Sequence, residues 1–392
     1  MRFVAALVGL FPLPALAQDW NTEPANAPYV AAFAGQTRAP VLPDVALTVT
    51  PLAQGLEHPW GMEELPDGRW LVTERPGRMR IVGDAVSAPI QGLPPVHAEG
   101  QGGLLDVAIA PDFAQTRRIW WSYAEPRGAL NGTAVATGVL SADETRVQDV
   151  QVIFAQQPGW ASDAHYGGRL AFAPDGALIL TTGERSDRRA RVQAQDPASH
   201  LGKVIRLNPM GGPAPGNPAL PGWAPEVWSI GHRNVQAAGF GPDGQLYTIE
   251  HGPLGGDELN RPQAGRNYGW PIITYGLEYS GAAIGQGQTR APGMEQPLYY
   301  WDPVIAPSGL VFYDGALFPD WQGSLLVGAL AGQALVRLTL EGQTLQGQAI
   351  TGEARYLQGM ARIRDVAVSR DGAVMILTDE DNGALIRLTP QD

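Results

Sequence analysis

Short apolar runs separated by turn residues dominate the chain, and the three-to-four-residue spacing of apolar positions that marks amphipathic helices is scarce. The recurring unit is a Pro-Asp-Gly or related turn, followed by a short strand, a second turn and another strand. In its first occurrence, the turn at residues 66–68 precedes apolar runs at residues 70–74 and 79–82. Because Asp and Gly tolerate positive φ, we expect antiparallel hairpins closed by type I′ turns, and hence an all-β protein.

Six turns of this kind follow one another, 45 to 77 residues apart. They begin at Pro66, Pro111, Pro174, Pro242, Pro319 and Arg370. Units of this size suit the radially arranged sheets of a β-propeller, which protects its strand edges by closing into a ring. The pattern therefore predicts a six-bladed β-propeller, with two stacked β-sandwich domains as the alternative.

The propeller is expected to form a single catalytic domain over residues 45–392. A strand predicted at residues 45–50 lies ahead of the first counted turn, so we expect it to complete the sheet of the last blade and close the ring. Residues 18–44 are rich in Ala and Pro and are expected to form an extended lead-in.

The N-terminus is typical of a secretory signal peptide. Arg2 is followed by an apolar run to Leu16, and Ala15-Leu16-Ala17 resembles a cleavage site. We expect residues 1–17 to be a signal peptide and the protein to be exported to the periplasm, with an uncleaved N-terminal anchor as the alternative. No later stretch contains 18 uninterrupted apolar residues, so no other membrane anchor is expected.

Composition narrows the possible chemistry. The 392 residues are 44% hydrophobic, enough for a large core. With 27 Lys+Arg against 39 Asp+Glu, the net charge of −12 would repel a nucleic-acid backbone. The absence of cysteine excludes thiolate metal sites, Cys nucleophiles and covalently attached haem. No Gly-x-Gly-x-x-Gly opens a βαβ unit, which argues against nicotinamide cofactors.

Among the histidines, His165 is the best candidate for chemistry. It precedes Tyr166 and two glycines, which allow the backbone to approach a ligand closely. After the following hairpin the chain reaches Glu184, whose carboxylate would return to the same end of the blade and could hold the imidazole in the tautomer that acts as a base. A packed, hydrogen-bonded histidine is the alternative. Three other histidines are interpreted as structural or surface residues, namely His58, His97 and His200.

Two further segments are candidates for ion binding. Residues 250–260 combine acidic residues with glycines that expose carbonyl oxygens, the ligands that calcium prefers; a solvated acidic turn is the alternative. Arg362 and Arg364 stand two apart at the start of a predicted strand, so their side chains would project on one face. Together with Arg233 they would bind a polycarboxylate if they converged at one end of the propeller, although single arginines are more often surface residues.

Seven stretches in order resemble the soluble quinoprotein aldose sugar dehydrogenases, the family that includes soluble glucose dehydrogenase and uses pyrroloquinoline quinone (PQQ). They are residues 58–62, 100–107, 165–169, 231–234, 250–260, 267–271 and 362–366. The fold of that family is also a six-bladed propeller. The resemblance implies a PQQ- and calcium-dependent enzyme that oxidises aldoses at the anomeric carbon to lactones, with hydride passing to the quinone.

The resemblance also assigns roles to single residues. His165 would be the general base, Glu184 would orient it, and Arg233 would act both in catalysis and in cofactor binding. The residues that match PQQ contacts are Gln101, Arg233, Asn234, Tyr279, Arg362 and Arg364. The backbone oxygens of Gly252 and Pro253 match the ligands of the calcium that polarises PQQ, and Glu258 and Tyr268 match ligands of a second, structural calcium.

One position departs from the family pattern. Ala331 is expected where family members often have a lysine that faces the cofactor, so one cation is missing and PQQ binding would be weaker. The expected partners are an aldose substrate and an external electron acceptor, a cytochrome or a quinone, because the chain has no haem attachment motif. Two other functions stay open at this point: a calcium-dependent lactonase-type hydrolase and a non-catalytic propeller that binds ligands.

Overall fold

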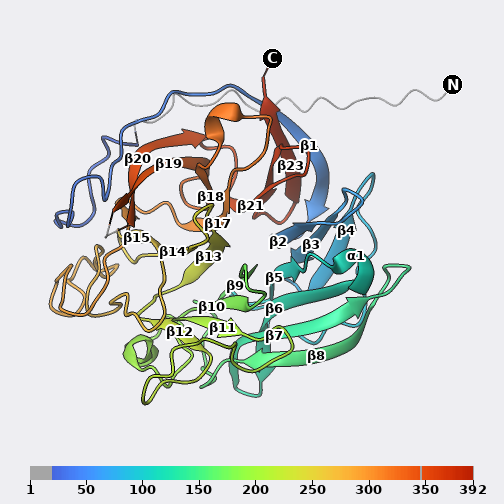
Figure 1. Ribbon diagram of the computed structural model, residues 1–392, viewed down its shortest axis with the longest axis horizontal. Helices are drawn as coiled ribbons and strands as arrows, with labels where there is room; N and C mark the ends of the chain where they lie inside the picture. Colours follow the sequence, from blue (N-terminus) through green and yellow to red (C-terminus); the bar gives the residue numbers. More distant parts are fainter. Residues whose placement is uncertain (1–19, 345–346, 392) are drawn as a thin grey trace.

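Six small sheets surround a central axis in the computed structural model, which describes residues 20–344 and 347–391 (Figure 1). The predicted six-bladed β-propeller is therefore confirmed. The predicted signal peptide, residues 1–17, lies outside the described residues. Within the part that is described, no helix is long and apolar enough to span a membrane.

Each blade is one antiparallel sheet of three or four strands. The first blade contains β2 (Pro59–Glu64), β3 (Trp70–Glu74) and β4 (Arg78–Val82). The second contains β5 (Leu104–Ile109), β6 (Arg118–Arg127), β7 (Leu130–Leu140) and β8 (Val147–Ala155). The third contains β9 (Gly167–Phe172), β10 (Leu178–Thr182), β11 (Lys203–Leu207) and β12 (Val227–Ile230).

The second half of the ring repeats this plan. The fourth blade contains β13 (Val235–Phe240), β14 (Leu246–Glu250), β15 (Asp257–Asn260) and β16 (Tyr299–Trp301). The fifth contains β17 (Pro307–Phe312), β18 (Leu325–Ala329), β19 (Ala334–Thr344) and β20 (Gly347–Tyr356). The sixth contains β21 (Ile363–Val368), β22 (Val374–Thr378), β23 (Gly383–Pro390) and β1 (Leu47–Leu56). The helical turns are short: α1 (Phe113–Thr116), α2 (Arg188–Arg191), η1 (Val192–Gln195) and η2 (Pro319–Trp321).

The ring is closed by strands from the two ends of the chain. β1 pairs antiparallel with β23, with Leu47 opposite Pro390 and Leu56 opposite Gly383. The strand predicted at residues 45–50 therefore completes the last blade as expected, although it extends further than the sequence indicated. Every other blade consists of consecutive strands, so the last blade is the one in which a strand from the first part of the chain pairs with strands from the last part.

All six turns counted in the sequence connect the first two strands of a blade, but the predicted turn type is wrong. At the first turn, Gly68 has φ +85° whereas Asp67 does not have positive φ. Leu65 N donates to Arg69 O at 2.7 Å and Gly68 N donates to Leu65 O at 2.9 Å, the pattern of a type I turn followed by a left-handed glycine. The Asp67 carboxylate accepts from Arg69 N at 3.1 Å, so it caps the turn instead of entering the left-handed region.

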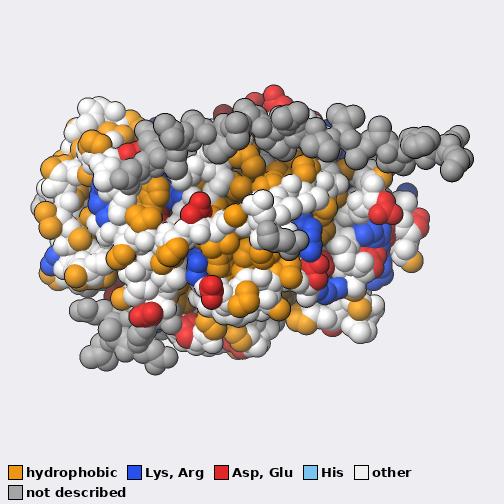
Figure 2. All heavy atoms as spheres, turned by 90° about the horizontal axis from the view of Figure 1, so that it is seen from above, with side chains coloured by type: hydrophobic (Ala, Val, Ile, Leu, Met, Phe, Trp, Pro, Cys, Tyr) orange, Lys and Arg blue, Asp and Glu red, His pale blue; other side chains and the backbone are white. Residues whose placement is uncertain are grey.

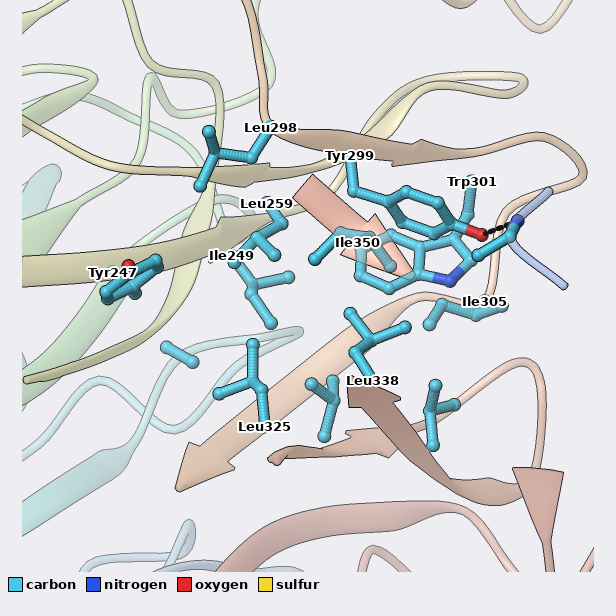
Figure 3. Close-up of a cluster of buried hydrophobic side chains, with 14 of the residues drawn as sticks. Tyr247, Ile249, Leu259, Leu298, Tyr299, Trp301, Ile305, Leu325, Leu338 and Ile350 are labelled. Carbon is cyan, nitrogen blue, oxygen red and sulfur yellow. Dashed lines mark hydrogen bonds between the residues drawn. The ribbon is translucent and has the colours of Figure 1, made fainter. Parts of the chain in front are cut away.

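Hydrophobic side chains pack between neighbouring blades, as between the fourth and the fifth (Figure 3). Leu259 and Trp301 of the fourth blade belong to one buried cluster with Leu325 and Leu338 of the fifth. The lead-in crosses the outside of this cluster, where Tyr299 Oη accepts from Ala39 N at 2.9 Å (Figure 3). Residues 20–44 thus lie against the propeller, with turns and bends over much of residues 20–38.

On the face seen in Figure 2, acidic and basic side chains are interspersed, and neither kind gathers in a large patch. The acidic excess of the chain is therefore dispersed on this face, and the concentration of arginine described below belongs to the interior of the ring.

Candidate active site

The topology brings the candidate residues to one end of the ring. The innermost strand of each blade, β2, β5, β9, β13, β17 or β21, contacts its two neighbours around the axis. All six run in the same direction, so the residues at their starts share one mouth. Because the second strand of each blade is antiparallel to the first, the residues at its end reach the same mouth. His165, Arg233 and Arg362 lie at starts, and Glu184 lies after an end.

His165 and Glu184 form a buried pair. The Nδ1 atom of His165 lies 3.0 Å from Glu184 Oε1, and the two residues are 6% and 1% exposed. A carboxylate accepts, so Nδ1 carries the proton and Nε2 keeps its lone pair. Burial, and secondarily the positive charge of Arg233, lower the pKa of His165 to about 4, although Glu184 acts in the opposite direction. The imidazole is therefore neutral at pH 7 and can accept a proton.

The backbone of His165 is held in an uncommon conformation with φ +48°. Its N–H donates to Gln101 Oε1 at 2.9 Å. Its carbonyl accepts from the buried guanidinium of Arg185, which also packs 3.6 Å from the ring centre of Tyr166. Asn234 Oδ1 accepts from Gly167 N at 3.1 Å and so joins the third blade to the fourth. Gln101 and Asn234 thus position the segment that carries His165.

The lowered pKa of His165 makes a direct prediction. In the ligand-free protein, the imidazole carbon resonances of His165 should titrate near pH 4, and a midpoint near 6.5 would contradict the burial argument. Between these values the unfolded chain binds the additional proton, so the contribution of His165 to stability is complete above about pH 6.5 and is lost as the pH falls toward 4. NMR titration of histidine-labelled protein tests this, with the spectrum of the His165→Ala variant to assign the signal.

Arg362 and Arg364 line a cavity of about 250 Å³ at the mouth. Arg364 is buried, and its NH2 donates to Asp379 Oδ2 at 2.5 Å while NH1 donates to Gln236 Oε1 at 3.3 Å. Arg362 is more exposed and lies 3.8 Å from the same Asp379 oxygen. Burial alone would raise the pKa of Asp379, but Arg364 holds it well below the ordinary range, so the carboxylate is charged.

Arg233 extends the positive charge from the fourth blade. It is 5% exposed, and its NH1 donates to the carbonyls of His251 and Gly252 at 2.9 and 2.7 Å. Its guanidinium lies 5.2 Å from the ring centre of Trp270 and 3.5 Å from the hydroxyl of Tyr279. Tyr279 is 74% exposed and marks the outer rim.

The four residues that sequence analysis assigned to metal binding surround one small void. Gly252, Pro253, Glu258 and Tyr268 all line a space of about 10 Å³, roughly the size of one water molecule. The resemblance assigns them to two separate calcium ions, whereas the structure brings them together.

The chemistry of this void suits a hard cation. Burial and the neighbouring Glu250 carboxylate raise the pKa of Glu258 well above its ordinary value, and a cation would relieve both effects. The Asn260 side-chain oxygen beside it is buried and has no donor. The carbonyl of Gly252 already accepts from a cation, the Arg233 guanidinium, and a carbonyl has a second lone pair.

Acidic and histidine side chains alone would not bind a metal here. Within residues 20–344 and 347–391, no three His, Asp or Glu side chains are grouped so that they could hold one. Both ring nitrogens of His232 already have hydrogen-bond partners and are not free to bind a metal. Nδ1 pairs with Glu250 at 3.0 Å and Nε2 pairs with Ser229 at 2.9 Å. Backbone and amide carbonyl oxygens are further ligands that calcium accepts.

Sequence analysis did not propose several residues that line the cavity, namely Trp60, Arg75, Gln236 and Asp379, and it interpreted His58 as a structural or surface residue. The signal that would have found two of them is their position. Arg75 and Asp379 each follow directly after the second strand of a blade, one residue before the corresponding position of Glu184.

The segment that lacks the expected lysine contributes differently from the prediction. Leu330 lines the cavity, and its carbonyl lies 3.5 Å from Arg362 NH1. Ala331 is exposed and lines a separate depression beside the lead-in. Because the Leu330 side chain is apolar, this segment brings no positive charge to the cavity.

Comparison with known proteins gives a consistent result. The family model described as glucose/sorbosone dehydrogenase matches residues 56–387. The aldose sugar dehydrogenase YliI of Escherichia coli (strain K12) is 41% identical over 355 residues, which cover 88% of this chain and 94% of the relative.

Two solved structures extend the comparison. A crystal structure of a glucose dehydrogenase is 47% identical, with a TM-score of 0.82 over 87% of this chain and 99% of the other. The PQQ-bound aldose sugar dehydrogenase of Streptomyces coelicolor is 29% identical, with a TM-score of 0.72 over 88% of this chain and 100% of the other. The similarity therefore extends over nearly the whole ring in both cases.

Proposed function

The chain belongs to the glucose/sorbosone dehydrogenase family and is a sugar dehydrogenase of the PQQ-dependent type; from this premise we propose that it oxidises aldoses at the anomeric carbon to lactones, with calcium as second cofactor and His165 as base. The observation that carries this proposal is the convergence of a neutral, carboxylate-oriented histidine with arginines from two blades at one mouth. A lactonase would not require such an arginine group.

In this proposal, His165 would accept the proton of the anomeric hydroxyl. Nδ1–H donates to Glu184, so Nε2 is the basic atom, and Glu184 stabilises the imidazolium once the proton has arrived. Glu184 Oε2 accepts from Ser186 N at 2.9 Å, which fixes the carboxylate in turn. When bound, PQQ supplies the acceptor for the hydride of the anomeric C–H bond and calcium supplies a Lewis acid beside it.

The cofactor carboxylates would be held by Arg362, Arg364 and Arg233, with Gln101 and Asn234 beside them. Arg364 presents a buried Nε–H that has no partner, and Arg233 does the same. Such groups are unfavourable in a buried site unless an acceptor is supplied, and a carboxylate is the acceptor that pairs best with guanidinium. The residues present therefore fit an anionic cofactor.

Calcium would draw on the Gly252 and Pro253 carbonyls, with Glu258 and Tyr268 around the same void. In the ligand-free chain Arg233 donates to the Gly252 carbonyl. A calcium ion at this carbonyl would therefore either share the oxygen with Arg233 or displace the guanidinium. Electrons would then pass to an external carrier, a cytochrome or a quinone. Export to the periplasm stays a prediction from the N-terminal sequence.

Reconstitution tests the proposed function. Purified protein given PQQ and calcium should reduce an artificial dye in the presence of an aldose and form the lactone, and it should do so only when both cofactors are present. A chelator such as EGTA should prevent reconstitution. Lactone hydrolysis without PQQ and without dye reduction would instead establish a hydrolase, and PQQ binding without turnover would establish a binding protein.

A further inference from the structure

Arg75 occupies a fixed place on the wall of the arginine cavity. It follows β3 directly, in the first blade, and its backbone is held on both sides. Arg75 N donates to His58 O at 3.1 Å, and Arg75 O accepts from Leu104 N at 3.0 Å. Its side chain lines the same cavity as Arg362 and Arg364.

The guanidinium of Arg75 is only partly used by the protein. NH1 donates to the carbonyl of Gly100 at 2.8 Å. The Nε atom is buried and has no hydrogen-bond partner. A buried N–H without an acceptor is unfavourable, so the protein does not use the full hydrogen-bonding capacity of this guanidinium.

The charges around the cavity do not balance. Among the described residues that line it, Arg75, Arg362 and Arg364 are opposed by one acidic side chain, Asp379. Asp379 is already engaged by Arg364 and by His58 Nδ1, which lies 3.0 Å away. The pKa of Arg364 is lowered, first by burial and in smaller part by the charges of Arg75 and Arg362. The cavity therefore carries excess positive charge that a bound anion would neutralise.

We propose that Arg75 is a further cofactor-binding residue, whose guanidinium donates to a carboxylate of the bound quinone cofactor from the first blade, beside Arg362 and Arg364 of the sixth. This inference rests on the proposed function, because it takes the anion to be PQQ. It also provides a cation at the cavity that does not come from the segment around Leu330.

A purely structural role for Arg75 would depend on the bond to Gly100. That bond holds the loop before β5, which includes Gln101, and could affect the cofactor without any contact. The two roles differ in one respect: a direct contact responds to the charge of the ligand, whereas a positioning effect changes affinity for charged and uncharged ligands alike.

The test measures binding and not turnover. Apoprotein with calcium is titrated with PQQ and with its trimethyl ester, in which the three carboxylates are uncharged, and quenching of tryptophan fluorescence is followed, since Trp60 lines the cavity. The variants are Arg75→Met, Arg75→Lys and, as a matched control from the same hairpin, Arg78→Met. Arg78 pairs with Glu74 and Glu57 at 2.9 and 2.6 Å and does not line the cavity.

Arg75→Met should raise the Kd for PQQ about ten- to a hundredfold, with Arg75→Lys intermediate, Arg78→Met unchanged, and all four proteins equal toward the ester. Equal affinity of wild type and Arg75→Met for PQQ would overturn the inference, as would an equal loss toward PQQ and ester. If Arg75→Met does not fold, Arg75→Lys provides the same contrast between the two ligands. Wild-type protein that fails to bind PQQ would overturn the proposed function itself, a result distinct from these.

Discussion

Replacing His165 by alanine should lower kcat about a hundred- to ten-thousandfold while the Kd for PQQ stays close to that of the wild type. The expectation follows from the proposed role of His165 as the base, because its imidazole is neutral and is paired with a buried carboxylate. General base catalysis contributes rate factors of this size. Steady-state dye reduction and fluorescence titration with PQQ measure the two quantities separately.

Two companion variants sharpen the assignment. Glu184→Gln keeps the shape of the side chain but removes the charge that stabilises the imidazolium, so kcat should fall less than in His165→Ala. His97→Ala is a matched control, since His97 also pairs with a carboxylate, that of Asp163 at 2.8 Å, whereas the His165 ring pairs with Glu184. A His165→Ala protein that lost PQQ but kept full turnover when saturated would show that His165 binds the cofactor and is not the base.

Replacing Arg364 by methionine should weaken PQQ binding by about 1.5–3 kcal/mol for the lost charge-assisted hydrogen bond. The same change should destabilise the fold, because Asp379 would lose its buried guanidinium partner at 2.5 Å and keep His58 and the more distant Arg362. Removing one partner of a buried ion pair lowers the free energy of unfolding by about 3–5 kcal/mol. Cofactor titration and thermal unfolding of the apoprotein distinguish the two effects.

The double variant Arg364→Met, Asp379→Asn separates binding from stability. Without a charge on residue 379, the destabilisation should be relieved in large part, whereas PQQ affinity should stay low because the guanidinium is still absent. Arg387→Met serves as the control for losing a surface arginine, since Arg387 pairs with the exposed Asp371 at 2.7 Å. Recovery of PQQ affinity together with stability would mean that Arg364 acts only through the fold.

The sequence predicted the fold through local signals. The turns beginning at Pro66, Pro174, Pro242 and Arg370 carry Asp-Gly pairs, and each closes the first hairpin of a blade. Hairpins are encoded by a few adjacent residues, and their number and spacing are enough to indicate a ring of six. The turn type could not be predicted as easily, because it depends on whether the Asp67 side chain caps the backbone or its φ becomes positive.

The candidate site was only partly accessible from sequence. His165 and Glu184 could be paired because they belong to one blade, where the start of the first strand and the end of the second meet by antiparallel geometry. The same rule would have indicated Arg75 and Asp379, but their importance depends on a partner in the neighbouring blade. Asp379 became significant only when Arg364 was seen beside it, buried in a common cavity.

By itself, the sequence determined the all-β class, the six repeated units, the pairing of His165 with Glu184, and the residue types available for binding an anion. The tertiary structure alone decided which groups meet at the cavity. It brings the Arg233 guanidinium to the Gly252 carbonyl and brings Leu330, not Ala331, to the cavity wall. It also leaves Arg75 Nε without an acceptor. The physical reason is that strands and turns arise from contacts between near neighbours, whereas burial and electrostatic balance at the mouth arise from residues of different blades, which meet only when the ring has closed.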